Sequence, residues 1–585
     1  MSAARKSRVA TERVVAHRLQ IRKRVVASGL SFLGIFLLLI GGLVYLQVAR
    51  DPSKVLGNVP TSMQKVKIHA VRGNITDRNG VLLAVTVDAR NVVADQTLVT
   101  DPRGEATKIA NLLDLDAATV AERLTGTRRF IYIAKNITPQ QWNQIDELSL
   151  PGVFSERSQT RSYPEGTLGA NILGFVNSSG VGMGGLELQF DDVLKGVDGE
   201  RSYSPVGGVT TADQEVTQAI DGNHVQLTID RDIQFIAQDA IAAQVKKAQA
   251  QSGSVIVLNS KTGEIYAMAT APTFDPNDLK NAKNSNLGNR ILTDVHEPGS
   301  TGKIMTMAAV LESGTMTPNS KLKVPGTLKR ADKTFKDAHK HPLEKLTLTG
   351  VLAKSSNIGS ILASETIGGT NLFNFLKKFG VAEKSGLGFP AESAGIIPKP
   401  NTSAWSATTE PTLAFGQGYS MNILQAAQVF ATIANNGVRM PAKLVSGFTD
   451  SSGRFQSAAD SRTPTQVVSA ATAKTLREMM ETVVSADGTA PLAKIAGYRV
   501  AGKTGTAQAF DPTCHCYRGY VSSFIGMAPA DAPEIVVAVW LVQPRNGYYG
   551  GTLAAPVFKT VMSFVLQQMR IPPTGTTPPK MKLTW

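Results

Sequence analysis

Three short strings carry side chains at spacings that suit nucleophilic acyl transfer. In chain order they are Ser300-Thr301-Gly302-Lys303, Ser355-Ser356-Asn357 and Lys503-Thr504-Gly505-Thr506. A lysine three residues after a serine on a helix lies on the same face, and a partly desolvated amine there can take the hydroxyl proton. The ordered set S-x-x-K, S-x-N and K-T-G therefore predicts an enzyme that transfers acyl groups through an active serine.

Because each string also recurs elsewhere, its surroundings must decide which copy carries the chemistry. The other copies are Ser62-Met63-Gln64-Lys65, Ser320-Lys321-Leu322-Lys323, Lys261-Thr262-Gly263 and Ser420-Met421-Asn422. Ser300 follows Glu297-Pro298-Gly299 and precedes apolar residues at helical spacing, which predicts a helix that begins near Ser300 and ends near Gly314. Lys261-Thr262-Gly263 instead joins two apolar runs, which predicts the turn of a β-hairpin.

The residues around these strings resemble those of class B penicillin-binding proteins, which are membrane-anchored D,D-transpeptidases that cross-link peptidoglycan. The similar strings are Asn289-Arg290-Ile291, Asp294-Val295-His296-Glu297-Pro298-Gly299-Ser300-Thr301, Phe415-Gly416-Gln417-Gly418, Arg72-Gly73-Asn74-Ile75-Thr76-Asp77-Arg78-Asn79-Gly80, Arg161-Ser162-Tyr163-Pro164, Leu173-Gly174-Phe175-Val176 and Gly185-Leu186-Glu187. The resemblance covers most of the chain, and the pattern looks most like the cell-division branch. It implies an α+β penicillin-binding transpeptidase fold, in which helices flank an antiparallel sheet, with an N-terminal β-rich pedestal domain.

The chain departs from the family pattern at three places. Ile304 follows Lys303 where members usually carry proline, and Ser420-Met421-Asn422 replaces an expected hydrophobic residue and threonine. An insertion with Cys514-His515-Cys516 follows the K-T-G string. None of these differences removes a reacting group, so they bear on fine specificity and leave the reaction class unchanged.

The resemblance assigns a role to each side chain that would make or break bonds. Ser300 would attack the penultimate D-alanine carbonyl of a stem peptide ending in D-Ala-D-Ala, with Lys303 as base, although the acylation base of this superfamily is disputed. Ser355 would pass a proton to the departing D-alanine, and Asn357 would orient Lys303 and the substrate amide. β-Lactams would acylate the same serine, and no cofactor or metal is expected.

The third string would bind the substrate. Lys503 would supply positive charge for the terminal carboxylate, and Thr504 and Thr506 would offer it their hydroxyls. Gly505 permits close approach of a ligand backbone. The backbone N–H groups of Ser300 and Thr506 would form the oxyanion hole.

Each of these residues has a plainer interpretation when it is taken alone. Ser355 or Asn357 could simply cap a helix, and Lys503 could be a solvated lysine on a strand. His296, next to the nucleophile, is interpreted as a packing or loop residue because Lys303 already fills the role of base. Only the ordered set of strings favours catalysis over these structural roles.

Two further function classes compete with a transpeptidase. One is a hydrolase, either a D,D-carboxypeptidase or a β-lactamase. The E-x-x-x-N string that a class A β-lactamase needs is missing between the second and third strings. The other class is a non-catalytic penicillin-binding division scaffold, a role that could coexist with catalysis.

The N-terminal region predicts a membrane anchor. Residues 25–48 contain no charged side chain, and 24 residues span about 36 Å as a helix. Of the formal net charge of +15, +7 falls within residues 1–24, which predicts a cytoplasmic N-terminus and an extracytoplasmic catalytic domain. A cleaved signal peptide is the alternative, but its apolar region is usually only about 7–15 residues long. The remaining charge of +8 carries no signature of nucleic-acid binding.

The chain has two cysteines, Cys514 and Cys516. In an oxidising compartment they could form a small disulfide that pins a loop beside the site, or remain free thiols. A metal site is disfavoured, because structural zinc needs four ligands at wider spacings.

The landmarks divide the chain into a basic segment (1–24), a membrane span (25–48), a short linker (50–59), a pedestal resembling a dimerisation domain (60–220), a transpeptidase domain (224–570) and a proline-rich tail (571–585). The tail is expected to be extended or disordered. The resemblance implies a membrane-embedded glycan polymerase and other division proteins as partners.

Overall fold

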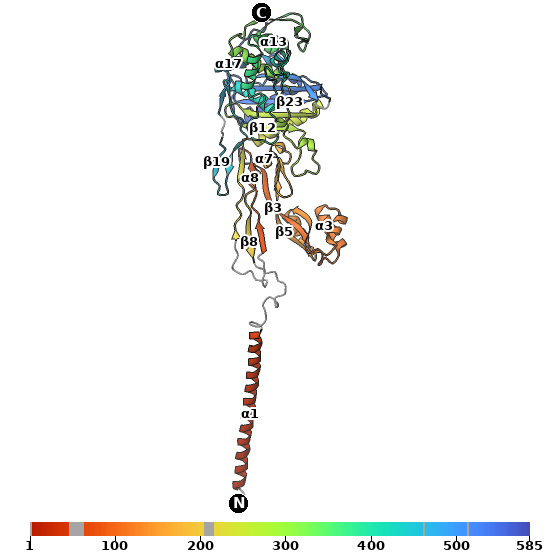
Figure 1. Ribbon diagram of the computed structural model, residues 1–585, viewed down its shortest axis with the longest axis vertical. Helices are drawn as coiled ribbons and strands as arrows, with labels where there is room; N and C mark the ends of the chain where they lie inside the picture. Colours follow the sequence, from red (N-terminus) through yellow and green to blue (C-terminus); the bar gives the residue numbers. More distant parts are fainter. Residues whose placement is uncertain (1–2, 46–63, 204–215, 460–462, 512–513) are drawn as a thin grey trace. The chain divides into compact units, whose positions relative to one another are not determined.

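The computed structural model describes residues 3–45, 64–203, 216–459, 463–511 and 514–585. The chain divides into two compact units, one made of Met1–His69 with Asp198–Ala219 and the other of Ala70–Val197 with Ile220–Trp585. The first unit contains the long helix α1 (Ala3–Val44), red in Figure 1. It also contains the sheet β1-β8-β9 (Gln64–Ile68, Gly199–Tyr203, Val216–Thr217).

Within α1, the segment Ile21–Val44 is long and apolar enough to cross a membrane. It overlaps most of the expected span, whose last residues lie outside the described residues, as does the whole expected linker 50–59. The basic residues before the span belong to the same helix.

An antiparallel sheet of five strands forms the centre of the second unit, in the order β12-β11-β23-β22-β21. The strands are β11 (Ser252–Asn259), β12 (Ile265–Ala271), β21 (Ala501–Asp511), β22 (Cys516–Ala528) and β23 (Ile535–Val542). The sheet therefore joins the yellow and the blue parts of the chain in Figure 1. The turn between β11 and β12 contains Lys261-Thr262-Gly263, which confirms the predicted hairpin.

Helices cover this sheet, so β11, β12 and β23 are buried along nearly their whole lengths. Helices α9 (Arg231–Ala248) and α18 (Gly550–Gln568) pack on it and on each other. Helices α16 (Ile423–Ala434) and α17 (Ala470–Val484) also pack on it, and α11 (Lys303–Glu312) packs on both of them. The antiparallel sheet with flanking helices predicted from the sequence is thus confirmed. The remaining elements of this region are η3 (Asn284–Asn286), α10 (Arg290–Thr293), η4 (Gly299–Gly302), β13 (Lys321–Val324), β14 (Leu328–Arg330), β15 (Lys333–Phe335), β16 (Glu344–Thr347), α12 (Leu348–Ala353), α13 (Asn357–Ser364), α14 (Gly369–Lys378), α15 (Thr409–Ala414), β17 (Val438–Arg439), β20 (Thr465–Gln466) and η5 (Pro491–Ala493).

The other large sheet of the second unit is mixed, in the order β19-β18-β10-β2-β3-β4 with β5 also paired to β3. It joins strands of the expected pedestal to β10, β18 and β19, which lie in the range expected for the transpeptidase domain. The strands of this sheet are β2 (Ile75–Thr76), β3 (Leu82–Ala94), β4 (Ile131–Ile137), β5 (Val153–Ser162), β10 (His224–Leu227), β18 (Val445–Thr449) and β19 (Phe455–Ser457). The other elements are α3 (Pro102–Leu113), α4 (Ala117–Leu124), α5 (Pro139–Asp146), α6 (Ala170–Leu173), β6 (Phe175–Val176), β7 (Gly182–Gly184), α7 (Gly185–Gln189) and α8 (Asp191–Leu194). Helices α3, α4 and α5 enclose a separate small core with β3 and β4.

A buried ion cluster joins three of the pedestal strings singled out from the sequence. The fully buried Glu187 accepts from Arg72 Nε at 2.7 Å and from Arg161 Nε at 2.7 Å. Arg72 also pairs with Asp191 at 2.7 Å. Residues far apart in the chain are thereby held together, and this cluster gives Arg72, Arg161 and Glu187 a structural role in strings that carry no chemistry.

The C-terminal tail is extended, as expected, and it packs against the catalytic region. Thr347 N donates to Leu583 O at 3.0 Å, and Trp585 Nε1 donates to Leu346 O at 3.1 Å. The ammonium groups of Lys321 and Lys345 lie 4.9 and 5.3 Å from the centre of the Trp585 ring. Cation–π contacts of this kind help to hold the tail on β13 and β16.

Candidate active site

The candidate nucleophile Ser300 lies on the 3₁₀ turn η4, which runs directly into α11. The turn lies against β21, and glycine is required on the strand side of this contact. A Cβ atom built at Gly505 would lie 3.1 Å from Pro298 O and 2.2 Å from Ser523 Oγ. Gly505 therefore lets the K-T-G strand approach the nucleophile closely.

Lys303 begins α11, and its side chain is completely buried beneath the serine. Its Nζ lies 3.0 Å from Ser300 Oγ, 2.7 Å from Asn357 Oδ1 and 2.6 Å from the Ser355 carbonyl oxygen. Burial lowers the pKa of Lys303 to about 7, an effect that the negative charge of Asp337 opposes. A substantial fraction of this amine is therefore neutral at neutral pH and able to accept the serine proton.

The S-x-N string occupies the junction between α12 and α13, where Ser355 has a φ of +60°. The cap of α13 is the middle residue: Ser356 Oγ accepts from Gly359 N at 2.8 Å. The helix-capping role that was the plainer interpretation of Ser355 or Asn357 thus belongs to Ser356. This leaves the flanking side chains free to face Lys303.

Lys503 reaches the same point from β21 and is also completely buried. Its Nζ lies 2.9 Å from Ser355 Oγ, which in turn lies 3.3 Å from Lys303 Nζ. Burial holds the pKa of Lys503 well below its usual range, and repulsion from Lys303 lowers it further. The Ser355 hydroxyl therefore bridges two buried amines that disfavour each other's charge.

The two threonines of the third string follow Lys503 on β21, one on each side of Gly505. Thr504 Oγ1 lies 3.4 Å from Lys503 Nζ and 2.7 Å from Thr489 Oγ1. Thr506 is half-buried, and its Oγ1 accepts from Gly550 N at 3.3 Å. The structure thus brings together Ser300, Lys303, Ser355, Asn357, Lys503 and Thr504, with Gly505 against the serine turn, whereas the hydroxyl of Thr506 contacts Gly550.

Asp337 is a member of this cluster that the sequence did not reveal. It lies on the segment between β15 and β16, and its side chain is only 10% exposed. Its carboxylate accepts from Ser356 Oγ at 2.6 Å and from the backbone N–H groups of Asn357 and Ile358 at 2.5 and 2.9 Å. No local pattern marks it, because its partners lie about twenty residues further along the chain.

Glu297 and Tyr419 are further residues whose positions the sequence did not predict. Glu297 Oε1 accepts from Gly418 N and from Tyr517 Oη, both at 2.9 Å, and burial raises the pKa of its carboxyl group. Tyr419 is buried against the nucleophile turn, and its hydroxyl has no hydrogen-bond partner among the residues that the structure describes. His296 packs against Trp540 with ring centres 5.6 Å apart, in agreement with its interpretation as a packing residue.

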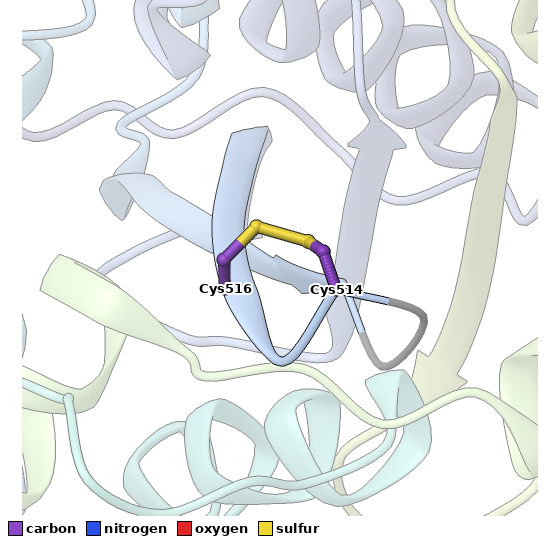
Figure 2. The surroundings of a disulfide bond; sticks show 2 residues. All are labelled: Cys514 and Cys516. Atoms are coloured by element: carbon purple, nitrogen blue, oxygen red, sulfur yellow. A yellow bond between two sulfur atoms is a disulfide. The ribbon is translucent and has the colours of Figure 1, made fainter.

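Cys514 and Cys516 form a disulfide at the tip of the β21–β22 hairpin, with Cα atoms 5.2 Å apart (Figure 2). Tyr517, the next residue, makes the contact with Glu297 described above. The insertion is thus tied through Tyr517 to the residue three positions before Ser300. Among the described residues, no group of three or more His, Cys, Asp or Glu side chains is arranged to hold a metal ion.

Comparisons with known proteins match both halves of the chain. Residues 253–563 match the penicillin binding protein transpeptidase domain, and residues 67–227 match the penicillin-binding protein dimerisation domain. The chain is 35% identical to penicillin-binding protein PbpB of Mycolicibacterium smegmatis, over 88% of this chain and 85% of the relative. It is 32% identical to peptidoglycan D,D-transpeptidase FtsI of Escherichia coli, over 92% and 90%.

A solved structure gives the same picture. The crystal structure of penicillin-binding protein 3 from Mycobacterium tuberculosis, complexed with aztreonam, has a TM-score of 0.71 and 32% sequence identity. The alignment covers 89% of this chain and 100% of that chain.

Proposed function

The chain belongs to the penicillin-binding protein transpeptidases, and on that premise we propose that it is a membrane-anchored serine D,D-transpeptidase. Its substrates are peptidoglycan stem peptides that end in D-Ala-D-Ala, and β-lactams acylate it. The observation that carries this proposal is the buried amine of Lys303, 3.0 Å from Ser300 Oγ, with its pKa lowered to about 7. A serine is a weak nucleophile unless such a base lies within reach.

The distances between Lys303, Ser300, Ser355 and Asn357 support an acylation step with Lys303 as base. Neutral Lys303 takes the proton of Ser300 as Oγ attacks the penultimate D-alanine carbonyl, and the Ser300 and Thr506 backbone N–H groups stabilise the developing oxyanion. Ser355 then delivers its hydroxyl proton to the amine of the departing D-alanine as the C–N bond breaks, and it takes in exchange the proton that Lys303 holds 3.3 Å away. Asn357 Oδ1, 2.7 Å from Lys303 Nζ, keeps the base aimed at the serine throughout.

Substrate binding also prepares the base. In the free site, burial lowers the pKa of both lysines, and repulsion from Lys303 lowers that of Lys503 further. A terminal carboxylate arriving beside Lys503 favours the protonated form of that residue. Because Ser355 Oγ lies between the two amines, a proton can pass from Lys303 to Lys503, which leaves Lys303 neutral when the carbonyl is in place.

The second half-reaction and the biological setting complete the proposal. An amine from a neighbouring stem peptide attacks the acyl-enzyme and forms the cross-link. The relatives named PbpB and FtsI favour septal wall synthesis in cell division. Ile21–Val44 is the anchor, the basic segment before it is cytoplasmic and the catalytic region is extracytoplasmic. A membrane-embedded glycan polymerase and other division proteins are the proposed partners.

Time-resolved labelling with a fluorescent penicillin tests the reaction class. The full chain in detergent micelles is labelled, with Ser300→Ala as the test variant and Ser320→Ala as its control, because Ser320 begins another S-x-x-K string. We expect label on the wild type and on Ser320→Ala that persists for hours, and none on Ser300→Ala. Label lost within seconds would instead indicate a hydrolase.

A donor–acceptor assay then separates a transpeptidase from a carboxypeptidase. A peptide ending in D-Ala-D-Ala is supplied with and without a D-amino acid acceptor, and the products are separated by chromatography. A transpeptidase forms the exchanged peptide when the acceptor is present. A product that is only the peptide shortened by one D-alanine, whatever the acceptor concentration, would contradict the proposal.

A further inference from the structure

We propose that Asp337 is a positioning residue for the acyl-transfer reaction: it fixes the S-x-N turn against Lys303 and supplies a counter-charge to that buried lysine. This inference rests on the proposed function, because it assigns a role within the same site. Among the described residues, Asp337 makes no hydrogen bond to Ser300 or to Lys303. It therefore acts through the groups that it binds.

The positioning role follows from the contacts of the carboxylate. It accepts from the backbone N–H groups of Asn357 and Ile358 at 2.5 and 2.9 Å, and these are the first residues of α13. N–H groups at a helix start have no partner within the helix, and an anion there is favourable. A third bond, from Ser356 Oγ at 2.6 Å, fixes the capping residue itself. The start of α13 is therefore anchored by Asp337 as well as by its own cap.

The same segment sets the orientation of the Asn357 amide. Asn357 Nδ2 donates to the carbonyl oxygen of Lys336 at 3.0 Å, which turns Oδ1 toward Lys303 Nζ, 2.7 Å away. A neighbouring ring holds the carboxylate in turn, since His341 Nε2 lies 3.0 Å from Asp337 Oδ2. Through Lys336 and Asp337, one loop thus determines where the S-x-N string stands relative to the base.

The charge of Asp337 matters because the site concentrates positive charge away from water. Lys303 on α11 and Lys503 on β21 are both completely buried. Asp337 is the charged group that raises the pKa of Lys303 against the effect of burial, while Lys303 lowers that of Lys503. His341 faces Asp337 from the same segment. Removing the carboxylate charge should therefore make Lys303 lose its proton at lower pH.

The test compares Asp337→Asn with Glu344→Gln in the full-length protein in detergent. Glu344 is a carboxylate on the neighbouring strand β16, but it pairs with exposed Lys354 at 2.8 Å, outside the site. The second-order rate of acylation by fluorescent penicillin is measured from about pH 5.5 to 9, together with the thermal unfolding midpoint. For Asp337→Asn we expect the plateau rate to fall by roughly 10- to 100-fold, as positioning losses do. We also expect the acidic limb of the profile to move to lower pH, whereas Glu344→Gln leaves both unchanged.

Asp337→Glu separates charge from position and serves if the asparagine variant does not fold. It keeps the charge but displaces the carboxylate by one methylene group, so we expect a lower plateau with the limb in its wild-type place. The inference would be overturned if the acidic limb of the pH–rate profile did not move in Asp337→Asn, or if Asp337→Glu had the wild-type plateau rate of acylation. Either result would leave the proposed function intact. A wild type that takes no label at all would overturn both.

Discussion

Gly302, the residue before Lys303, controls how closely the nucleophile turn can approach the rest of the site. A Cβ atom built there lies 2.4 Å from the Tyr419 hydroxyl oxygen and 3.0 Å from Gly416 Cα. An ordinary contact needs roughly 3.5 Å, so Gly302→Ala must open this contact by about 1 Å. Tyr419 is buried and cannot swing away, so the turn that carries Ser300 must move.

Overpacking of this kind costs about 1–3 kcal/mol of unfolding free energy. A displacement of about 1 Å at a reacting atom can slow the reaction by about 100-fold. We therefore expect Gly302→Ala to retain its fold but to be acylated by fluorescent penicillin tens of times more slowly than the wild type. Gly288→Ala is the control, because a Cβ there meets no atom within 4 Å.

The double variant Gly302→Ala with Tyr419→Phe identifies the cause. Tyr419→Phe removes a buried hydroxyl that no described residue bonds, and so its own effect should be small. In the double variant, most of the lost acylation rate should return. A small part of the loss should remain, because the new Cβ atom still lies 3.0 Å from Gly416 Cα. A wild-type rate for Gly302→Ala, or a double variant as slow as the single one, would show that the contact between Gly302 and Tyr419 does not control the nucleophile turn.

Three other outcomes are expected. The acylation rate of the wild type should rise about tenfold from pH 6 to pH 8, because Lys303 is the base in its neutral form and its pKa is about 7. An acylation rate that does not change with pH in stopped-flow labelling would exclude Lys303 as the base. Replacing Cys514 and Cys516 by serine should slow labelling severalfold by loosening the Tyr517 contact with Glu297, and an unchanged rate would show that the disulfide does not support the site. Glu187→Gln should lower the free energy of unfolding by about 3–5 kcal/mol, because buried Arg161 loses the counter-charge of Glu187 and Arg72 keeps only Asp191, and wild-type stability in urea would contradict this.

The parts of the site that the sequence predicted are those fixed by local spacing. The helical turn at Ser300 and the hairpin at Lys261 follow from apolar periodicity and from Gly and Pro positions within a few residues. The order of the three strings, together with the family resemblance, predicted that they form one site. Even there, local reasoning offered Ser355 or Asn357 as a helix cap, whereas the cap is Ser356.

The parts that escaped prediction depend on contacts between distant segments. Asp337 reaches α13 across about twenty residues, Tyr517 reaches Glu297 across 220 residues, and Tyr419 packs on a turn more than a hundred residues earlier. A single aspartate or tyrosine in a loop carries no periodicity, and loops tolerate such residues for many reasons. Only the folded arrangement shows which of them touch the reacting groups.

The most direct test of the central claim is to locate the acyl group. The full-length protein is incubated with benzylpenicillin, digested and sequenced by tandem mass spectrometry, in parallel with Ser300→Ala. We expect one stable adduct on the peptide that contains Ser300, and no adduct on that peptide in the variant. An adduct on Ser355, or on a serine of another S-x-x-K string, or an adduct that survives in Ser300→Ala, would contradict it.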